Sequence, residues 1–293
     1  MDRQRTRVGW QFLVGLAAAA SLAACSAGGI ATGPVDTSDD VTGSIPSAAA
    51  STNVASLSDV VARSPRDPQA YNMRGAVLGQ AGRTQEALAD FNKAISLDPN
   101  FAQAFANRGL VYRQAGKLDQ ALIDYNRAIA IDAGYATAYV GRGMVHRQKG
   151  QLIAALNDLN KAIQIRPDSA EAYYDRGLLY QSQRQHPYAI DDFTTAIGLA
   201  QQKAGPFVAR GLSYLAVNDP KSAAKDLDDA VQIEPKSLQA WASRGLAYER
   251  LNDREKAAGS YAQAMEIRRD YEPASQGFAR VGGQMGRSYR LFD

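Results

Sequence analysis

The sequence predicts an all-α fold, a solenoid of six helical hairpins with partial capping helices at its ends. First, an Arg-Gly pair recurs every 34 residues, at Arg74-Gly75, Arg108-Gly109, Arg142-Gly143, Arg176-Gly177, Arg210-Gly211 and Arg244-Gly245. Second, aromatic residues flank most of these glycines at helical spacing. Third, two alanines follow each glycine at constant distances. A fixed period with helical patterning is typical of stacked repeat proteins.

The composition is that of an ordinary soluble protein with a nearly balanced charge. The chain has 293 residues, of which 45% are hydrophobic and 22% charged, and a formal net charge of +3. Loss of residues 1–24, the signal segment described next, would remove three arginines and one aspartate and leave a charge near +1. Because such a chain has little electrostatic attraction for polyanions, we expect no nucleic-acid partner.

The amino terminus has the layout of a bacterial export signal. Three arginines within the first seven residues precede a mostly apolar run, residues 8–24, which is short for a membrane span. The run ends in Leu-Ala-Ala followed by Cys25, which resembles the lipobox where a lipoprotein signal is cleaved before an acylated cysteine. Cys25 is the only cysteine of the chain. We expect a signal peptide over residues 1–24 and lipid attachment at Cys25. The alternative is an ordinary signal peptide with an incidental cysteine.

The segment after the signal is expected to be a flexible linker, residues 25–56. Small and polar residues dominate it, and no periodic apolar face runs through it. A coil of roughly thirty residues has a root-mean-square reach of about 30 Å, so it would hold the folded part clear of a bilayer. Ser26 resembles the residue that lets acylated lipoproteins move on to the outer membrane. Residues 57–67 predict an N-terminal capping helix.

Each repeat predicts two antiparallel helices. On the first helix, the residues four before and three after the glycine share a stripe with it. These are Tyr71, Phe105, Tyr139, Tyr173, Phe207 and Trp241, and Leu78, Tyr112, His146, Tyr180, Tyr214 and Tyr248. The second helix carries the alanine pairs Ala87/Ala94, Ala121/Ala128, Ala155/Ala162, Ala189/Ala196, Ala223/Ala230 and Ala257/Ala264. A glycine inside a helix costs about 1 kcal/mol relative to alanine. We therefore expect the glycines to face the alanines, so that the two helices approach closely.

This pattern resembles the tetratricopeptide repeat (TPR) family. The resemblance covers six units over residues 68–271 and rests on the glycine, the two alanines, the aromatics and a proline after the second helix in three units. Arginine replaces the aliphatic residue usual before the glycine, and His146 stands in a tyrosine position. The resemblance implies a right-handed superhelical solenoid whose concave wall is lined by the first helices.

The carboxyl end predicts a closing element for the solenoid. Residues 272–293 are expected to form a C-terminal capping helix and tail, with Ala274, Phe278 and Ala279 on its packing face.

The repeated arginines have a matching series of carboxylates. Fifteen residues after the glycines stand Asp90, Asp124, Asp158, Asp192 and Asp226, and Ser260 breaks the series. Constant spacing predicts a bidentate guanidinium–carboxylate pair within each hairpin. The alternative is that the arginines form a ladder that binds anions.

Catalytic chemistry is not expected. The chain has two histidines and one cysteine, so a Cys-His pair or a metal shell of His and Cys cannot be assembled within the folded part. His146 occupies a packing position and His186 lies in a turn, and we expect both to be incidental. No enzyme activity, cofactor or metal site is therefore expected.

The concave wall implied by the resemblance contains the candidate binding groove. Residues three before, one after and four after each glycine lie about 100° round the helix from the packing stripe. The candidate groove residues are Asn72, Leu110, Arg113, Val140, Met144, Arg147, Tyr174, Leu178, Gln181 and Leu212. Either these residues are exposed and grip apolar side chains of a partner, or they pack between successive repeats. The positions of the carboxylate clamp known in chaperone-binding TPRs are mostly apolar here, so a terminal-carboxylate ligand is not expected.

The combined features predict a lipid-anchored envelope adaptor that binds proteins or peptides in its groove. The layout resembles that of NlpI-type lipoproteins, which bring a periplasmic protease together with cell-wall hydrolases, and implies a similar linking role. The alternative is a structural scaffold subunit of an envelope secretion or pilus assembly. The expected location is the bacterial cell envelope, on the outer membrane facing the periplasm. The partners would be other envelope proteins, and the oligomeric state is left open.

Overall fold

The computed structural model describes residues 47–292, which form fourteen α-helices and no strand. The helices are α1 (Ser47–Arg63), α2 (Pro68–Gln80), α3 (Thr84–Leu97), α4 (Ala102–Gln114), α5 (Leu118–Ile131), α6 (Ala136–Gln148), α7 (Leu152–Ile165), α8 (Ala170–Ser182), α9 (His186–Leu199), α10 (Ala204–Ala216), α11 (Pro220–Ile233), α12 (Leu238–Arg250), α13 (Arg254–Ile267) and α14 (Glu272–Arg280). The expected signal segment, Cys25 and the linker up to residue 46 lie outside the described residues. No helix in the described part is long and apolar enough to cross a membrane.

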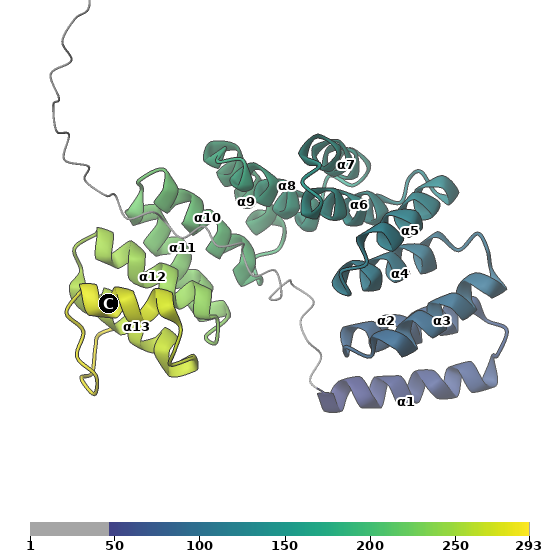
Figure 1. Cartoon of the computed structure of the whole chain (residues 1–293), viewed down its shortest axis with the longest axis horizontal. Helices are drawn as coiled ribbons and strands as arrows, with labels where there is room; N and C mark the ends of the chain where they lie inside the picture. The colour runs from purple at the N-terminus through teal and green to yellow at the C-terminus, as the bar shows by residue number, and fades with distance from the viewer. Residues whose placement is uncertain (1–46, 293) are drawn as a thin grey trace, which may run out of the picture. The chain divides into compact units, whose positions relative to one another are not determined.

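Helices α2 to α13 form six hairpins that stack in chain order, as the sequence predicts (Figure 1). The first helix of each hairpin packs against its own second helix and against the second helix of the preceding hairpin. First helices also contact the first helices of neighbouring hairpins. Within residues 47–292, no second helix contacts another second helix. The first helices therefore lie closer together than the second helices, and they form one continuous wall.

The two ends of the array are closed by single helices. Helix α1 packs on α2, and α14 packs on α12 and α13. Helix α1 begins at Ser47, ten residues before the expected start of the capping helix, so residues 47–56 are helical where a flexible linker was expected. This stretch is rich in alanine, a strong helix former, and its Val54 packs against the cluster that contains Leu78 of α2. On α14, Ala274 and Phe278 are buried as expected, whereas Ala279 is exposed.

Each repeated glycine leaves room for a large side chain of the second helix to pack against it. A Cβ atom on Gly177 would lie 2.5 Å from the Phe193 ring, and one on Gly245 would lie 2.6 Å from the Tyr261 ring. The facing residues, sixteen after the glycine, are Phe91, Tyr125, Leu159, Phe193, Leu227 and Tyr261. The prediction that the glycines face the alanines is therefore wrong in its main contact. The alanines are fully buried, but the close approach leaves room for an aromatic or leucine side chain beside the glycine.

The turn inside each hairpin has a residue in the left-handed backbone conformation at the same position. In the first three hairpins it is held by glycine, for example Gly82 with φ +73°. In the last three it is held by Arg184, Asn218 and Asn252, with φ between +59° and +62°. Asparagine tolerates this conformation better than other side chains do, so Arg184 is the strained member of the series.

Candidate functional site

The candidate site is the inner wall, defined as the surface of α2, α4, α6, α8, α10 and α12 that faces away from the second helices. Four of the predicted groove residues are buried beneath this surface: Asn72, Val140, Met144 and Leu178 are at most 7% exposed. Asn72 accepts a hydrogen bond from Asn107 of the next first helix at 2.9 Å. Met144 and Val140 pack with Leu159 and Leu179. For these four residues, packing between successive repeats is the alternative that holds, so a partner cannot reach them without a rearrangement.

Five of the other predicted groove residues are only partly accessible. Leu110, Arg147, Tyr174 and Leu212 are half-buried. Gln181, also half-buried, donates from its amide nitrogen to the Ala209 carbonyl and the Ser213 hydroxyl, both at 2.9 Å. A binding role for these residues stays a prediction.

Arg113 is buried and takes part in a tyrosine contact that the sequence did not reveal. It hydrogen-bonds to the hydroxyl of Tyr125, which reaches the inner wall from the second helix α5. A Cβ atom on Gly141 would lie 2.3 Å from the Tyr125 ring, so only glycine leaves the tyrosine room to pass. Burial raises the pKa of the Tyr125 hydroxyl, and Arg113 opposes that rise. Arg113 is thus positioned by its own repeat and is not a freely moving cation.

Exposed glutamines recur on the first three helices of the inner wall, and the sequence analysis missed them. Gln80, Gln114 and Gln148 are exposed and stand at the last positions of α2, α4 and α6, 34 residues apart. Gln69 and Gln103 are exposed at the second positions of α2 and α4, on the same helical stripe. Their recurrence with the repeat period was a signal that could have found them. A primary amide both donates and accepts hydrogen bonds, as does the backbone of an extended peptide.

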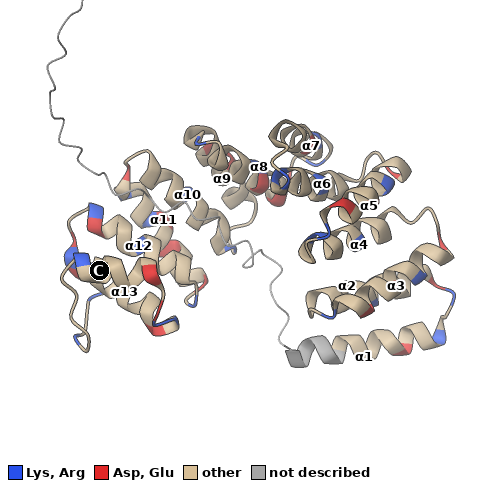
Figure 2. Ribbon diagram, in the orientation of Figure 1, with Lys and Arg blue, Asp and Glu red and all other residues tan. Residues whose placement is uncertain are grey.

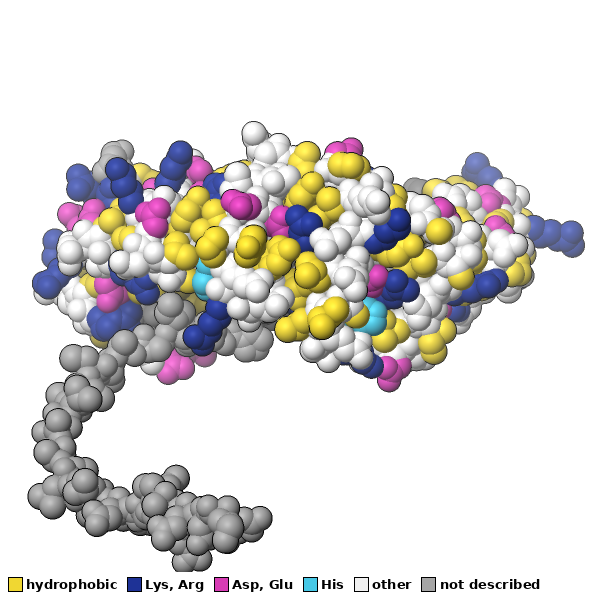
Figure 3. Space-filling model, turned by 90° about the horizontal axis from the view of Figure 1, so that it is seen from above, with side chains coloured by type: hydrophobic (Ala, Val, Ile, Leu, Met, Phe, Trp, Pro, Cys, Tyr) yellow, Lys and Arg dark blue, Asp and Glu magenta, His cyan; other side chains and the backbone are white. Residues whose placement is uncertain are grey.

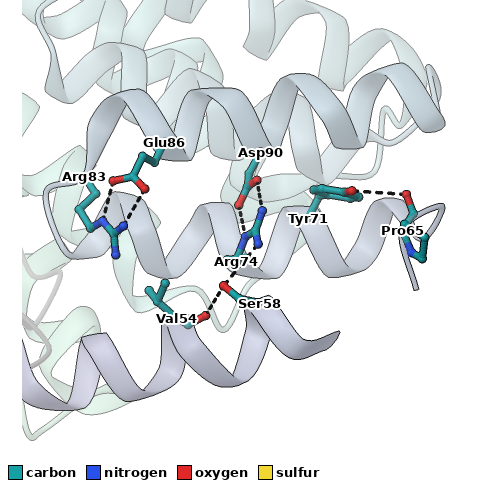
Figure 4. A network of polar contacts seen from close by, with 8 residues as sticks. All are labelled: Val54, Ser58, Pro65, Tyr71, Arg74, Arg83, Glu86 and Asp90. Carbon is teal, nitrogen blue, oxygen red and sulfur yellow. Dashed lines mark hydrogen bonds and ion pairs between the residues drawn. The ribbon is translucent and has the colours of Figure 1, made fainter. Parts of the chain in front are cut away.

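The arginine–aspartate pairs lie on the opposite side of the first helices, and their prediction is confirmed. Each pair is bidentate: in the third repeat Arg142 donates from Nε and Nη2 to the two oxygens of Asp158, at 2.8 and 2.7 Å. Figure 4 shows the equivalent pair of Arg74 and Asp90 in the first repeat. Hydrogen bonds to Asp158 raise the pKa of Arg142 against the opposing effect of burial. Because the carboxylates are buried and already paired, the anion-ladder alternative loses its support.

A second series of side chains links each arginine to the preceding unit. The Nη1 atoms of Arg108, Arg142 and Arg176 donate to Asn92, Asn126 and Asn160, at 2.6 to 2.7 Å. Arg74 uses Ser58 of α1 for the same purpose, which ties the capping helix to the first repeat (Figure 4). The asparagines recur every 34 residues, so this series was also visible in the sequence. Each arginine therefore joins three helices.

The two histidines interact with residues of their own hairpins. His146 Nδ1 lies 2.6 Å from the Gln151 side chain, and its Nε2 lies 3.7 Å from Asp158. Burial lowers the pKa of His186, and the nearby Arg184 lowers it further. Residues 47–292 contain no group of three or more His, Cys, Asp or Glu side chains placed to hold a metal ion. Basic and acidic side chains are interspersed along the helices (Figure 2).

Stacked hairpins whose first helices form one wall define a helical-repeat protein of the kind that binds other proteins or peptides. Family models described as TPR repeat match residues 109–150 and 143–183, and models described as tetratricopeptide repeat match residues 68–101, 91–123 and 208–273. The chain belongs to the tetratricopeptide repeat family.

Solved structures show the same fold at low sequence identity. A chain of the APC/C hetero-tetramer Cut9-Hcn1 is 20% identical with a TM-score of 0.72, covering 79% of this chain and 46% of that chain. The pilF protein of Pseudomonas aeruginosa is 19% identical with a TM-score of 0.65, covering 73% of this chain and 97% of that chain. A tetratricopeptide repeat protein from Parabacteroides merdae is 19% identical with a TM-score of 0.57, covering 80% and 93%. A comparison with curated proteins gave no match.

Proposed function

We propose that this chain is a lipid-anchored adaptor of the bacterial cell envelope that binds extended segments of partner proteins on its inner wall. The observation that carries the binding part is the exposed glutamine stripe, which offers donors and acceptors at a spacing set by the repeat. Partly buried Leu110 lies on α4 with Gln103 and Gln114 and adds apolar contact area, and Tyr174 adds more on α8. Cys25, behind the expected export signal, supports the anchoring part, and Ser26 supports the location on the outer membrane.

The proposed role resembles that of NlpI-type adaptors, which bring a protease together with cell-wall hydrolases. A wall repeated over six hairpins can hold a long segment at several points or two segments side by side. No catalytic role is part of the proposal.

Anchoring is tested by lipid labelling in bacteria. The wild type should take up a palmitate analogue and be cleaved before Cys25, and Cys25→Ala should remain uncleaved and unlabelled. An unlabelled wild type would remove the anchoring part of the proposal.

Binding is tested by capture from solubilised envelope membranes. Gln114→Ala with Gln148→Ala should lose the partners that the wild type captures, at an unchanged melting temperature, because both side chains are exposed. Gln164→Ala is the matched control, since Gln164 is an exposed glutamine on the second helix α7. Equal capture by all three proteins would place the binding site elsewhere.

A structural scaffold subunit of an envelope assembly is the second candidate, and one observation favours it. Ile123, Ile153 and Tyr188 are 62% to 81% exposed on the second helices α5, α7 and α9. Figure 3 shows hydrophobic side chains gathered over the middle of the face on which α7 and α9 lie. A scaffold would bury such residues in a lasting interface. In the capture experiment, a scaffold would lose its partners with Ile123→Asp and Ile153→Asp and keep them with the glutamine variants.

A further inference from the structure

The sixth arginine differs from the other five because a segment of the chain covers it. In the first five repeats the arginine side chain is 15% to 22% exposed, whereas Arg244 is 1% exposed. The cover is the C-terminal tail, residues 288–292. Arg244 donates from Nη2 to the Leu291 carbonyl, and the Phe292 ring lies over its guanidinium group with 4.8 Å between the guanidinium carbon and the ring centre.

The surface that the tail covers is repeated along the molecule. We call it the arginine slot: the arginine at the floor, the second helices of its own and the preceding unit at the sides, and aromatic rings along the first helix. In the sixth slot the sides are α13, through Ser260, and α11, through Asp228, and the rings are Trp241 and Tyr248. In the second slot the corresponding rings are Phe105 and Tyr112.

Three residues of the sixth slot differ from the residues at the same positions in the other repeats, and together they accommodate the tail. Ser260 replaces the aspartate that would occupy the Nη2 donor now used by Leu291. Asp228 replaces the asparagine or threonine of other repeats and restores the missing carboxylate, 2.6 Å from Arg244 Nε. Gly259 leaves space beside the tail, since a Cβ atom there would lie 2.9 Å from both Leu291 and Tyr289.

The tail contacts the sixth arginine slot as a short bound peptide would. Its contacts with Arg244 use one backbone carbonyl, that of Leu291, and one aromatic ring, that of Phe292, which remains 43% exposed. The Leu291 side chain faces Gly259, and the Tyr289 ring packs against Phe278 at 6.0 Å between ring centres. Between α14 and the tail lie Gly282 and Gly286, both with positive φ, and the loop leaves a pocket of about 700 Å³ next to Met265 on α13. The end of the tail therefore lies in the sixth arginine slot, and a pocket remains beside it.

We propose that the sixth arginine slot is a binding site for an extended peptide with an aliphatic residue followed by an aromatic one, occupied in cis by residues 289–292. The guanidinium group of Arg244 recognises the peptide carbonyl and stacks on the aromatic ring. This site is distinct from the inner wall, because it lies between second helices. It is independent of the proposed adaptor function.

The test uses a fluorescently labelled peptide with the sequence of residues 287–293, RSYRLFD, added to the full-length chain. In the wild type the tethered tail is a competitor with an effective concentration in the millimolar range, so the peptide should bind weakly. An open-tail variant, with Tyr289→Ser, Leu291→Ser and Phe292→Ser, should bind it at least about tenfold more tightly by fluorescence anisotropy.

Two further substitutions in the open-tail variant locate the peptide. Gly259→Val should abolish binding, because the valine side chain fills the place of the leucine in the slot. Gly198→Ala is the matched control, since its Cβ would meet no atom within 4 Å, and binding should be unchanged. Absence of binding to a folded open-tail variant, checked by circular dichroism, would overturn the proposal. So would equal binding by the Gly259→Val form.

A second measurement does not depend on altering the tail. In the otherwise wild-type chain, Gly259→Val should expel the tail and increase acrylamide quenching of Trp241, which packs against Phe292 at 6.4 Å between ring centres. Unchanged quenching in this variant would also overturn the proposal.

Discussion

Repeats one to five and repeat six pair their arginine with carboxylates from different positions. Both groups bury a guanidinium group between three helices and neutralise it with one carboxylate. In repeats one to five that carboxylate comes from the same hairpin, as with Asp158, whereas in repeat six Asp228 of the preceding hairpin supplies it. The exchange moves the negative charge to the other side of Arg244 and frees one edge of the guanidinium for the tail. A buried guanidinium group needs a paired carboxylate in every repeat. In repeat six this pairing is kept while one edge of the guanidinium becomes available to the tail.

The largest effect is expected when the carboxylate of the sixth repeat is removed. Asp228→Asn leaves Arg244, which is 1% exposed, without a counter-charge, and should cost about 3–5 kcal/mol of unfolding free energy. Asp158→Asn strands the more exposed Arg142 and should cost about half as much. Chemical denaturation of both variants measures the difference. Equal losses would mean that burial of the arginine does not decide the cost.

A smaller effect is expected from the coupling inside one ordinary repeat. Arg142→Leu alone strands Asp158, which is 8% exposed, and should cost about 2 kcal/mol, whereas Arg142→Leu with Asp158→Asn should cost less than either change alone. The control is Arg83→Leu, which breaks the exposed pair with Glu86 and should cost under about 1 kcal/mol. Strictly additive losses in the double variant would contradict the pairing.

The sequence was sufficient to predict the repeated hairpins and the arginine–aspartate pairs within them. Arg74 and Asp90 could be matched because both recur every 34 residues. The partner of Gly75 could not be predicted from spacing alone, since Ala87 and Phe91 are both on the facing side of α3 and the depth of packing decides between them. The sequence shows that Ser260 interrupts the aspartate series. It does not show that Leu291, which lies 31 residues further on and outside any repeat, accepts the hydrogen bond from Arg244 that the aspartate would otherwise accept.

Burial on the inner wall was the least predictable property. Met144 and Leu110 occupy the same position of their repeats, yet Met144 is buried and Leu110 is half-buried. The difference depends on which residues the neighbouring first helices bring, and a single hairpin does not contain that information. The start of α1 was misjudged for a related reason, because alanine-rich sequence fits a linker until a packing partner is known.

The second and sixth repeats also differ in how they hold a buried tyrosine, and this difference should respond to pH. The Tyr261 hydroxyl donates to Glu249 at 2.6 Å, and Arg280 of α14 binds the same carboxylate. Burial alone would raise the pKa of Glu249, but the hydrogen bonds from Arg280 and Tyr261 lower it overall. A lowered pKa in the folded state gives stability that is present above the unfolded value of about 4.3 and is lost as the pH falls through the folded value.

Acidification should therefore loosen α14 before it affects the second repeat. The protection factors for hydrogen exchange of α14, which are corrected for the intrinsic pH dependence of exchange, should fall between about pH 5 and pH 3, while those of α5, where Tyr125 pairs with Arg113, should change less. Glu249→Gln should remove most of the pH dependence of α14 in this window. A dependence that persists in Glu249→Gln would assign it to another carboxylate.

The smallest expected change in stability accompanies the substitution that tests the comparison most directly. Asp228→Asn with Ser260→Asp gives the sixth repeat the residues of repeats two to four, so Arg244 keeps one carboxylate and the unfolding free energy should shift by less than about 1 kcal/mol. The new aspartate would take the Nη2 donor from Leu291 and release the tail. We expect acrylamide quenching of Trp241 to increase while the melting temperature stays nearly constant. Unchanged quenching in this stable double variant would contradict the account, because it would show that the departures at residues 228 and 260 do not hold the tail.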